Sequence, residues 1–255
     1  MKGKKETRTA VNVCLKELRL PSARASYEGL AEKAIQQQLD YEEYLLEVVE
    51  VERQARRNKR TEKLLRESRL PLEKTVQAFQ MDRLPKKALS QVKALLDGTF
   101  LGRTENVLAF GNPGSGKTHL LCALGQELIG QLGKRVYYAK CDLLVQELLR
   151  AKQELKLPRL LKKLAGYDAL ILDDIGYVQQ SREEMEVLFT LLAERYERGS
   201  VMITSNLPFS KWEAIFKDPM VTAAAIDRLI HHSVIVELNI PSYRMKQAKA
   251  AASPA

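Results

Sequence analysis

The stretch Gly111–Thr118 (GNPGSGKT) constrains the fold of this chain more than any other part of its sequence. It matches G-x-x-x-x-G-K-[ST] at every fixed position, and the glycines of this pattern let backbone N–H groups surround phosphate oxygens. An apolar run, 107–110, precedes it, and 119–129 carries leucines at helical spacing. Because phosphate binds such a loop at the positive end of the helix that follows, this order predicts a nucleotide-binding core. A glycine-rich surface turn is the alternative, and the flanking pattern disfavours it.

Apolar runs alternate with helical patterns after Asn106, which is typical of a parallel α/β sheet. The candidate strands are 107–110, 135–139, 169–172, 201–204 and 234–238. Between them, Asp142 is expected to cap one helix, and Ser181 with Glu184 to form the capping box of the next. The predicted fold class is therefore α/β, with a parallel five-stranded sheet.

The N-terminal region, 1–75, has helical spacing throughout. Asp40 and Glu43 form a predicted capping box for a long helix that extends to about Ser68. The apolar stripe of this helix consists of Tyr41, Tyr44, Leu45, Val48 and Val49. The predicted domains are a small all-helical N-terminal domain for adaptor or DNA contacts at 1–75, a core at 76–245 and a flexible tail at 246–255.

The phosphate loop assigns two tasks to its own residues. Lys117 is expected to reach the β- and γ-phosphates of ATP, and the Thr118 hydroxyl to bind Mg²⁺. The predicted ATP-binding segment is Gly111, Asn112, Pro113, Gly114, Ser115, Gly116, Lys117, Thr118 and His119. The predicted cofactors are thus ATP and Mg²⁺.

A second candidate part of the ATP site begins where the apolar run 169–172 meets Asp173 and Asp174. Asp173 would hold Mg²⁺ through water, and Asp174 would act as the general base on the attacking water. Without a phosphate loop, such a pair would usually form a turn or cap a helix. Together with the loop, a catalytic function is the preferred interpretation.

Two further residues complete the predicted catalytic set. Asn206 follows the strand candidate 201–204, and parallel strands share their carboxyl edge, so its amide should lie near the loop and could fix the attacking water. Arg228 comes near the end of a helical segment, from which it could project into the γ-phosphate of a neighbouring subunit. The alternatives are that Asn206 merely starts a turn and that Arg228 pairs with Asp227.

The composition favours a polyanionic partner. The chain carries 41 Lys and Arg against 32 Asp and Glu, a net charge of +9, and nucleic acid is the commonest partner of such an excess. A basic stripe on the long N-terminal helix is the predicted duplex DNA contact, and a solvated face is the alternative. The stripe consists of Arg53, Arg56, Arg57, Arg60 and Lys63.

Other features argue against several classes of protein. No apolar run approaches the roughly 18 residues of a membrane span, so no membrane partner is expected. Cys14, Cys122 and Cys141 form neither a metal pattern nor an even disulfide set, which favours buried thiols and a cytoplasmic location. The histidines lack metal-ligand spacing and are interpreted as structural or solvated.

Four segments together resemble the IstB family of AAA+ ATPases, helpers of insertion-sequence transposition that are related to DnaC-type helicase loaders. The segments are GNPGSGKTHLLCALG at 111–125, LILDDIGYV at 170–178, ITSNLPFSKW at 203–212 and AIDRLIHH at 225–232. The resemblance covers about 76–245, and more weakly the helical N-terminal region. It implies AAA+ sheet topology, Asn206 as the sensor residue after Thr204 and Ser205, and Arg228 as the arginine finger.

The resemblance also implies an activity. Proteins of this family assemble with ATP as homo-oligomers on duplex DNA, deform it and present it to a partner transposase, which stimulates ATP hydrolysis. Asp174 departs from the usual Glu of AAA+ proteins, and its shorter carboxylate predicts slow intrinsic hydrolysis. The stretch after Leu238 is too short for the usual C-terminal helical lid, and Arg244 is a candidate to replace the lid arginine.

The predicted function is that of an ATPase acting as a DNA-transposition helper of a mobile element. A replicative helicase loader of the DnaC type is the nearest alternative. Two other classes stay open: a small-molecule phosphotransferase built on the same loop, and a DNA-binding module whose ATP site is inert. The basic helical region and Arg228 argue against the phosphotransferase, and comparison of hydrolysis by the parent and Asp174→Asn tests the inert module.

Overall fold

The computed structural model describes residues 3–176, 181–212 and 219–243. By packing, the chain divides into two compact units, Met1–Lys63 and Leu64–Ala255. The sequence placed the domain boundary at residue 75. The division in the structure falls earlier, inside a helix, because Leu64 and Leu70 belong to the hydrophobic core of the second unit. Arg244 and the predicted tail 246–255 lie outside the described residues.

The first unit is helical, as predicted. It contains α1 (Lys4–Glu17), α2 (Pro21–Gln37) and most of α3 (Tyr41–Ser68). The predicted capping box of α3 is confirmed: Glu43 N–H donates to Asp40 Oδ1 over 2.7 Å, and Asp40 N–H donates to Glu43 Oε2 over 2.9 Å. These bonds satisfy N–H groups that a helix start otherwise leaves unpaired.

The predicted apolar stripe of α3 is only partly buried. Val48 lies in a small core with Ala23 and Tyr27. Tyr41 is 93% exposed, and Leu45 and Val49 are more than half exposed. Helical spacing therefore identified the helix correctly, but it overestimated how much of the stripe this small unit can cover.

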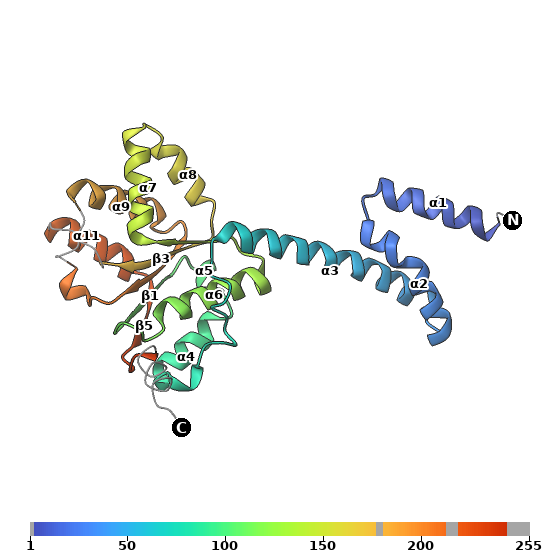
Figure 1. Ribbon diagram of the computed structural model, residues 1–255, viewed down its shortest axis with the longest axis horizontal. Coiled ribbons are helices and arrows are strands. Elements are labelled where there is room, and N and C mark those ends of the chain that lie inside the picture. The colour runs from blue at the N-terminus through green and yellow to red at the C-terminus, as the bar shows by residue number, and fades with distance from the viewer. Residues whose placement is uncertain (1–2, 177–180, 213–218, 244–255) are drawn as a thin grey trace, which may run out of the picture. The chain divides into compact units, whose positions relative to one another are not determined.

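The second unit is a three-layer α/β structure around one parallel sheet, and the predicted AAA+ topology is confirmed (Figure 1). The strands are β1 (Asn106–Gly111), β2 (Val136–Lys140), β3 (Ala169–Ile175), β4 (Ser200–Ser205) and β5 (Ser233–Leu238), in the order β2-β3-β4-β1-β5. The helices are α4 (Lys86–Leu95), α5 (Thr99–Gly102), α6 (Lys117–Leu132), α7 (Cys141–Gln153), α8 (Leu157–Ala165), α9 (Arg182–Arg195) and α11 (Pro219–Ile230), with short 3₁₀ helices η1 (Met81–Arg83) and η2 (Phe209–Lys211). Each candidate strand is present, with ends within a few residues of the prediction.

Alternate residues of the strands face the two helical layers. On β3, Ile171 belongs to the core shared with α4 and α6, whereas Leu170 and Leu172 belong to the core shared with α7 and α9. All three are fully buried. Because strand side chains alternate in direction, a continuous apolar run is what a sheet covered on both faces requires.

Two details correct the sequence analysis. Asp142 does not cap α7, because the helix begins at Cys141 directly after β2, with Lys140 at the N-cap position. Cys122 and Cys141 are buried as expected, and burial raises the pKa of each thiol to about 12. Cys14 is exposed, so the prediction of buried thiols is wrong for this residue. No helix among the described residues is long and apolar enough to cross a membrane.

Candidate functional site

The predicted phosphate loop connects β1 to α6 and lies at the carboxyl edge of the sheet. Gly111 and Gly114 have φ angles of 152° and 79°, values that favour glycine. A Cβ atom at Gly111 would collide with the carbonyl oxygen of Leu238, and one at Gly114 with the hydroxyl of Ser242. The loop is therefore closely packed, with glycine where the backbone has no room for a side chain.

Ser115 lies inside this loop and is 2% exposed. Its Oγ is buried and has no hydrogen-bond partner among the described residues. A buried hydroxyl without a partner costs about 1–3 kcal/mol. A phosphate oxygen bound in the loop would accept a hydrogen bond from this hydroxyl, so Ser115 fits a phosphate-binding site.

Lys117 is buried at the start of α6, with 5% of its surface exposed. Its Nζ donates to the carbonyl oxygens of Gly111 and Asn112 over 2.9 and 3.0 Å, and to Asn206 Oδ1 over 2.5 Å. Since β1 and β4 are neighbours, the ends of both strands meet here. The structure thus brings Lys117 and Asn206 together, and the lysine is engaged by the protein itself.

Asp173 is a buried residue near the end of β3 and is held at both carboxylate oxygens. Oδ1 accepts from Thr118 Oγ1 over 2.7 Å and from Thr204 Oγ1 over 2.6 Å. Oδ2 accepts from the Tyr138 hydroxyl over 2.9 Å. These oxygens are the donor type that Mg²⁺ prefers, so the arrangement fits the predicted metal ligands Thr118 and Asp173.

Tyr138 was missed by the sequence analysis. It lies on β2, next to β3 in the sheet, where it pairs in register with Ile171. Burial, and then the charge of Asp173, raise the pKa of Tyr138 well above its usual value, so its hydroxyl stays a donor at neutral and mildly alkaline pH. The sequence shows a tyrosine near the end of a candidate strand. Its contact with Asp173 could be predicted only once β2 was known to lie beside β3.

Asp174 follows Asp173 at the same edge and is exposed. Its φ is 60°, a left-handed conformation that Asp tolerates better than most residues, and its N–H donates to Thr204 Oγ1 over 2.7 Å. The register between β3 and β4 shifts between Leu172 and Ile175. This irregularity interrupts the alternation of β3 and leaves Asp174 accessible while Asp173 stays buried.

A small pocket adjoins the loop beside Gly116 and was not anticipated. Its lining includes Phe79, Arg83, His119 and Tyr243. The Phe79 and His119 rings meet edge to face at 5.3 Å, and the Arg83 guanidinium lies 5.3 Å from the centre of the Tyr243 ring. Tyr243 N–H also donates to the Gly114 carbonyl over 2.9 Å. Segments from both ends of the second unit thus complete the surroundings of the loop.

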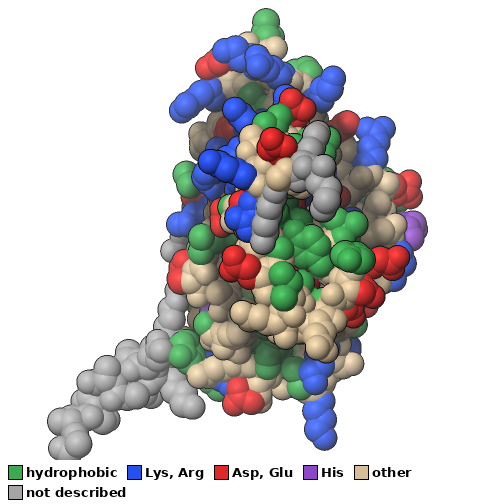
Figure 2. Space-filling view, turned by 90° about the vertical axis from the view of Figure 1, so that its right-hand side faces the viewer, with side chains coloured by type: hydrophobic (Ala, Val, Ile, Leu, Met, Phe, Trp, Pro, Cys, Tyr) green, Lys and Arg blue, Asp and Glu red, His purple; other side chains and the backbone are tan. Residues whose placement is uncertain are grey.

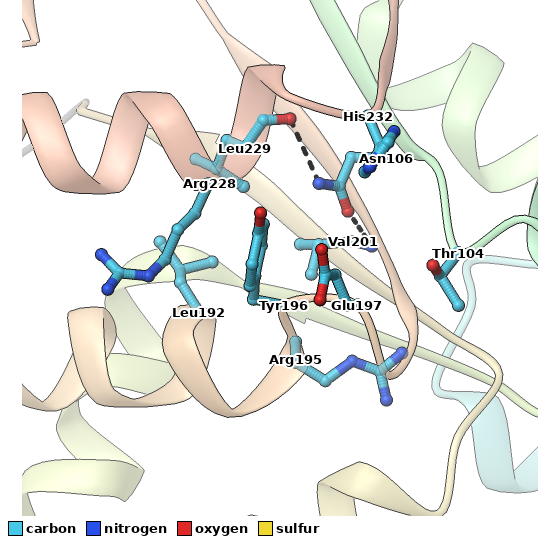
Figure 3. A pocket seen from close by; sticks show the side chains of 10 residues that line it. All are labelled: Thr104, Asn106, Leu192, Arg195, Tyr196, Glu197, Val201, Arg228, Leu229 and His232. Carbon is cyan, nitrogen blue, oxygen red and sulfur yellow. Dashed lines mark hydrogen bonds between the residues drawn. The ribbon is translucent and has the colours of Figure 1, made fainter.

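Arg228 lies at the opposite, amino edge of the sheet and so does not join the cluster around Lys117 (Figure 3). Its Nη1 donates to the Ala224 carbonyl over 3.1 Å, and its guanidinium lies 5.0 Å from the centre of the Phe189 ring. Beside it, Asn106 donates to the Leu229 carbonyl over 3.1 Å and accepts from Val201 N–H over 2.8 Å.

Arg195 is another buried polar side chain at this edge, with 2% of its surface exposed. Its guanidinium donates to the carbonyl oxygens of Leu164, Tyr167, Asp168 and Ser200. Burial lowers the pKa of Arg195 to about 10, which leaves it charged at neutral pH. Its bonds connect three chain segments and make it a structural residue.

The predicted basic stripe of α3 is exposed at all five positions, Arg53, Arg56, Arg57, Arg60 and Lys63. Within the first unit, Arg53 pairs with Glu50 at 2.7 Å and Arg56 with Glu52 at 2.8 Å. A second group of basic side chains, which the sequence analysis missed, lines an open depression between α7 and α8. The charged residues of its lining are Arg150, Lys156, Arg159 and Lys163, together with Glu147 and Glu154. Figure 2 shows Lys and Arg side chains mixed with Asp and Glu over the visible face.

Comparisons with known proteins show the family to which this chain belongs. Residues 13–251 match the family described as IstB-like ATP binding protein. A putative insertion sequence ATP-binding protein of Sinorhizobium fredii is 41% identical over 94% of this chain and 81% of its own length. The insertion sequence IS21 putative ATP-binding protein of Pseudomonas aeruginosa is 37% identical over 94% of this chain and 91% of its own length.

Among solved structures, the DnaC helicase loader shares the fold with a TM-score of 0.53. The match covers 61% of this chain and 89% of the loader, at 19% sequence identity. At this identity the likeness concerns the fold alone.

Proposed function

Since this chain belongs to the family of IstB-like ATP-binding proteins, we propose that it is an ATP-hydrolysing helper of IS21-type transposition. In this proposal it assembles on duplex DNA, deforms it and delivers it to a partner transposase, and hydrolysis remodels the complex. The observation that carries the proposal is the cluster of Lys117, Thr118, Asp173 and Asn206 at one edge of an AAA+ sheet.

ATP binding uses the loop and the start of α6. Backbone N–H groups of 111–118 and the positive end of α6 bind the phosphates. The buried Ser115 hydroxyl, which otherwise has no partner in the described part of the chain, donates a hydrogen bond to a phosphate oxygen. Lys117 turns from its protein partners to the β- and γ-phosphates. Thr118 and Asp173 would hold Mg²⁺, which supplies charge neutralisation on the phosphate oxygens.

Water activation uses the residues beside this cluster. Asp174 accepts a proton from the attacking water, and its short carboxylate keeps hydrolysis slow. Asn206 orients the same water once Lys117 has left it. Because Lys117 cannot fully engage both Asn206 and phosphate, arrival of ATP itself releases the Asn206 side chain for this task.

The pocket beside Gly116 suits the base of the nucleotide. Phe79 and Tyr243 provide aromatic surface, and the pocket opens next to the phosphate loop. His119 then belongs to this pocket, where its Nε2 lies 2.9 Å from the Thr75 carbonyl, and not to the phosphates.

Arg228 completes the site of a neighbouring subunit. It lies at the opposite edge from its own loop, so contact with a γ-phosphate requires a second chain. An arginine supplied in this way raises hydrolysis by about 10³ to 10⁵. Hydrolysis is therefore coupled to assembly, and ATP and homo-oligomer formation support each other.

DNA contacts come from the exposed basic residues of α3 and from the lysines and arginines that line the depression between α7 and α8. Bending 20–30 base pairs by 40–90° costs on the order of 1–6 kcal/mol, which many phosphate contacts can offset. Binding to phosphates releases counterions, so DNA affinity should fall steeply between low and moderate salt. An affinity that stays flat over this range would contradict these contacts.

Sedimentation of the full chain tests the proposal. ATP and duplex DNA together should produce a large assembly, ADP should not, and Lys117→Ala should abolish it. Lys87→Ala, an exposed lysine of α4, is the matched control and should assemble normally. A monomer under all these conditions would overturn the shared site and favour the phosphotransferase or the inert module.

The fold likeness to the DnaC loader keeps a helicase loader as the second candidate. Both functions use the same ATP site and differ in the partner. Pull-down with the transposase of the same insertion sequence and with the replicative helicase separates them. Capture of the helicase alone would favour the loader.

A further inference from the structure

Two turns at the amino edge of the sheet bring metal-binding side chains together, although these residues are distant in the sequence. Glu197 follows α9 and precedes β4, and His231 with His232 form the turn between α11 and β5. Among the described residues, these three form a group whose potential ligand atoms all lie within 4.8 Å of one another. We infer that Glu197, His231 and His232 form a binding site for one divalent transition-metal ion of the Zn²⁺ type.

The donor set decides the class of ion. Two imidazoles and one carboxylate suit Zn²⁺ and similar borderline metals better than Mg²⁺ or Ca²⁺, which prefer oxygen ligands. In a tetrahedral site with metal–ligand bonds of about 2.1 Å, ligand atoms are about 3.4 Å apart. Glu197, His231 and His232 are exposed, so their side chains can rotate to close the remaining distance. Water then occupies the fourth position.

The backbone on both sides of the site is held in place. His231 N–H donates to the Asp227 carbonyl over 2.9 Å, and the His232 carbonyl accepts from Asn106 N–H over 2.7 Å. The Asn106 side chain bonds to Val201, after the Glu197 turn, and to Leu229, before the His231–His232 turn, as the dashed lines in Figure 3 mark. The distance between the two turns is thus fixed before a metal binds.

One of the histidines also has an orienting partner. The Tyr196 hydroxyl lies 3.2 Å from His231 Nδ1, which directs the opposite nitrogen, Nε2, to the metal. The His231 and His232 rings meet edge to face, with centres 4.2 Å apart. Such outer hydrogen bonds fix ring orientation in metal sites.

The surrounding charges permit a cation. Arg103 donates two hydrogen bonds of 2.9 Å to Glu105, and the Arg195 guanidinium donates to backbone carbonyls. The nearest basic group on α11 is Arg228, and Figure 3 shows its guanidinium directed away from Glu197. A bound ion would therefore connect the two turns, and the guanidinium of Arg228 would point away from it.

Titration of the full chain with Zn²⁺, followed by calorimetry, tests this site. The parent should bind one ion per chain at this edge. His232→Ala and Glu197→Gln should each weaken binding by at least the roughly 10- to 100-fold that loss of an outer partner costs. Glu194→Gln removes a partly exposed carboxylate that pairs with Arg198, and it should leave the affinity unchanged.

A second measurement separates this site from other metal binding. Zn²⁺ should protect His231 and His232 from acylation by diethyl pyrocarbonate, read by mass spectrometry, and should not protect His119. Circular dichroism and ATP binding of the variants confirm that the fold is intact, because the ATP site lies at the other edge. Absence of saturable binding, equal binding by His232→Ala and the parent, or equal weakening by Glu194→Gln would each overturn the inference.

Discussion

The two edges of one sheet bury polar side chains for different purposes. At the carboxyl edge, the Asp173 carboxylate accepts hydrogen bonds from the side chains of Thr118, Thr204 and Tyr138. Lys117 Nζ bonds to the Asn206 side chain as well as to two backbone carbonyls of the loop. At the amino edge, the Asn106 and Arg195 side chains form hydrogen bonds with backbone groups of several segments. Two bonded side chains can exchange partners when a ligand arrives. Side chains that bond to the backbone instead fix the turns at the ends of the strands. The first edge is thus built to rearrange and the second to stay fixed.

Arg228→Ala should have the largest effect. It should show that the amino edge contributes to hydrolysis in a neighbouring subunit and not to ATP binding in its own. We expect assembly-stimulated hydrolysis to fall by about 10³ to 10⁵, with ATP binding unchanged, because Arg228 lies away from its own loop. Hydrolysis as a function of protein concentration, with DNA present, measures the first quantity. Arg198→Ala, an exposed arginine that pairs with Glu194, is the control and should behave as the parent.

Mixing two inactive variants sharpens this test. Arg228→Ala retains Asp174, and Asp174→Asn retains Arg228, so an equal mixture should regain activity at roughly a quarter of its interfaces. Failure of the mixture to exceed the sum of its components would show that Arg228 does not act on a neighbouring site.

Asn106→Leu should show that the amino edge is structural. It leaves Val201 N–H and the Leu229 carbonyl buried without this partner, at about 1–3 kcal/mol each, so the free energy of unfolding should fall by about 2–6 kcal/mol. Urea unfolding measures it. The residue is 8% exposed, so water offers little compensation. A loss below 1 kcal/mol, on the scale of surface substitutions, would remove this distinction between the edges.

Asn206→Ala should affect chemistry more than stability. Hydrolysis should fall by about 10² to 10³, as when one preorganised group of an active site is removed. ATP should bind a few-fold more tightly, because Lys117 no longer has to leave Asn206 before it reaches phosphate. Equilibrium binding of a fluorescent ATP analogue measures the second effect. Weaker binding would mean that the Lys117–Asn206 bond does not compete with the nucleotide.

Tyr138→Phe should have the smallest effect. Loss of one hydrogen bond to Asp173 costs about 1 kcal/mol, so Mg²⁺-dependent ATP binding should weaken roughly fivefold. Because the pKa of Tyr138 is raised, the difference from the parent should be the same at pH 7 and pH 9. Tyr137→Phe, on the opposite face against Tyr167, is the control. An equal effect of both variants would assign Tyr138 to packing.

The sequence was informative where local pattern and local structure coincide. The loop at 111–118, the candidate strands and the two predicted capping boxes depend on nearby residues, and the structure contains all of them. Parallel strands share their edges, so the sequence could also place Asn206 near the phosphate loop, where it meets Lys117, before the strand order was available.

The residues that were missed depend on which elements become neighbours. Tyr138 reaches Asp173 only because β2 lies beside β3, and Glu197 meets His231 only because β4 and β5 flank β1. Phe79 and Tyr243 come from opposite ends of the second unit. The exposure of the α3 stripe had a different origin, since helical spacing predicts an apolar face but not what covers it.

The position of Arg228 also bears on the symmetry of any assembly that uses it. Loop and arginine lie on opposite edges of the sheet, so one chain can serve one neighbour and be served by another. In that arrangement the contacts are heterologous, and repetition produces a ring or an open helix. In an open helix, the terminal chains keep one unfilled site and one unused arginine, so only closure or the end of the DNA path limits its growth.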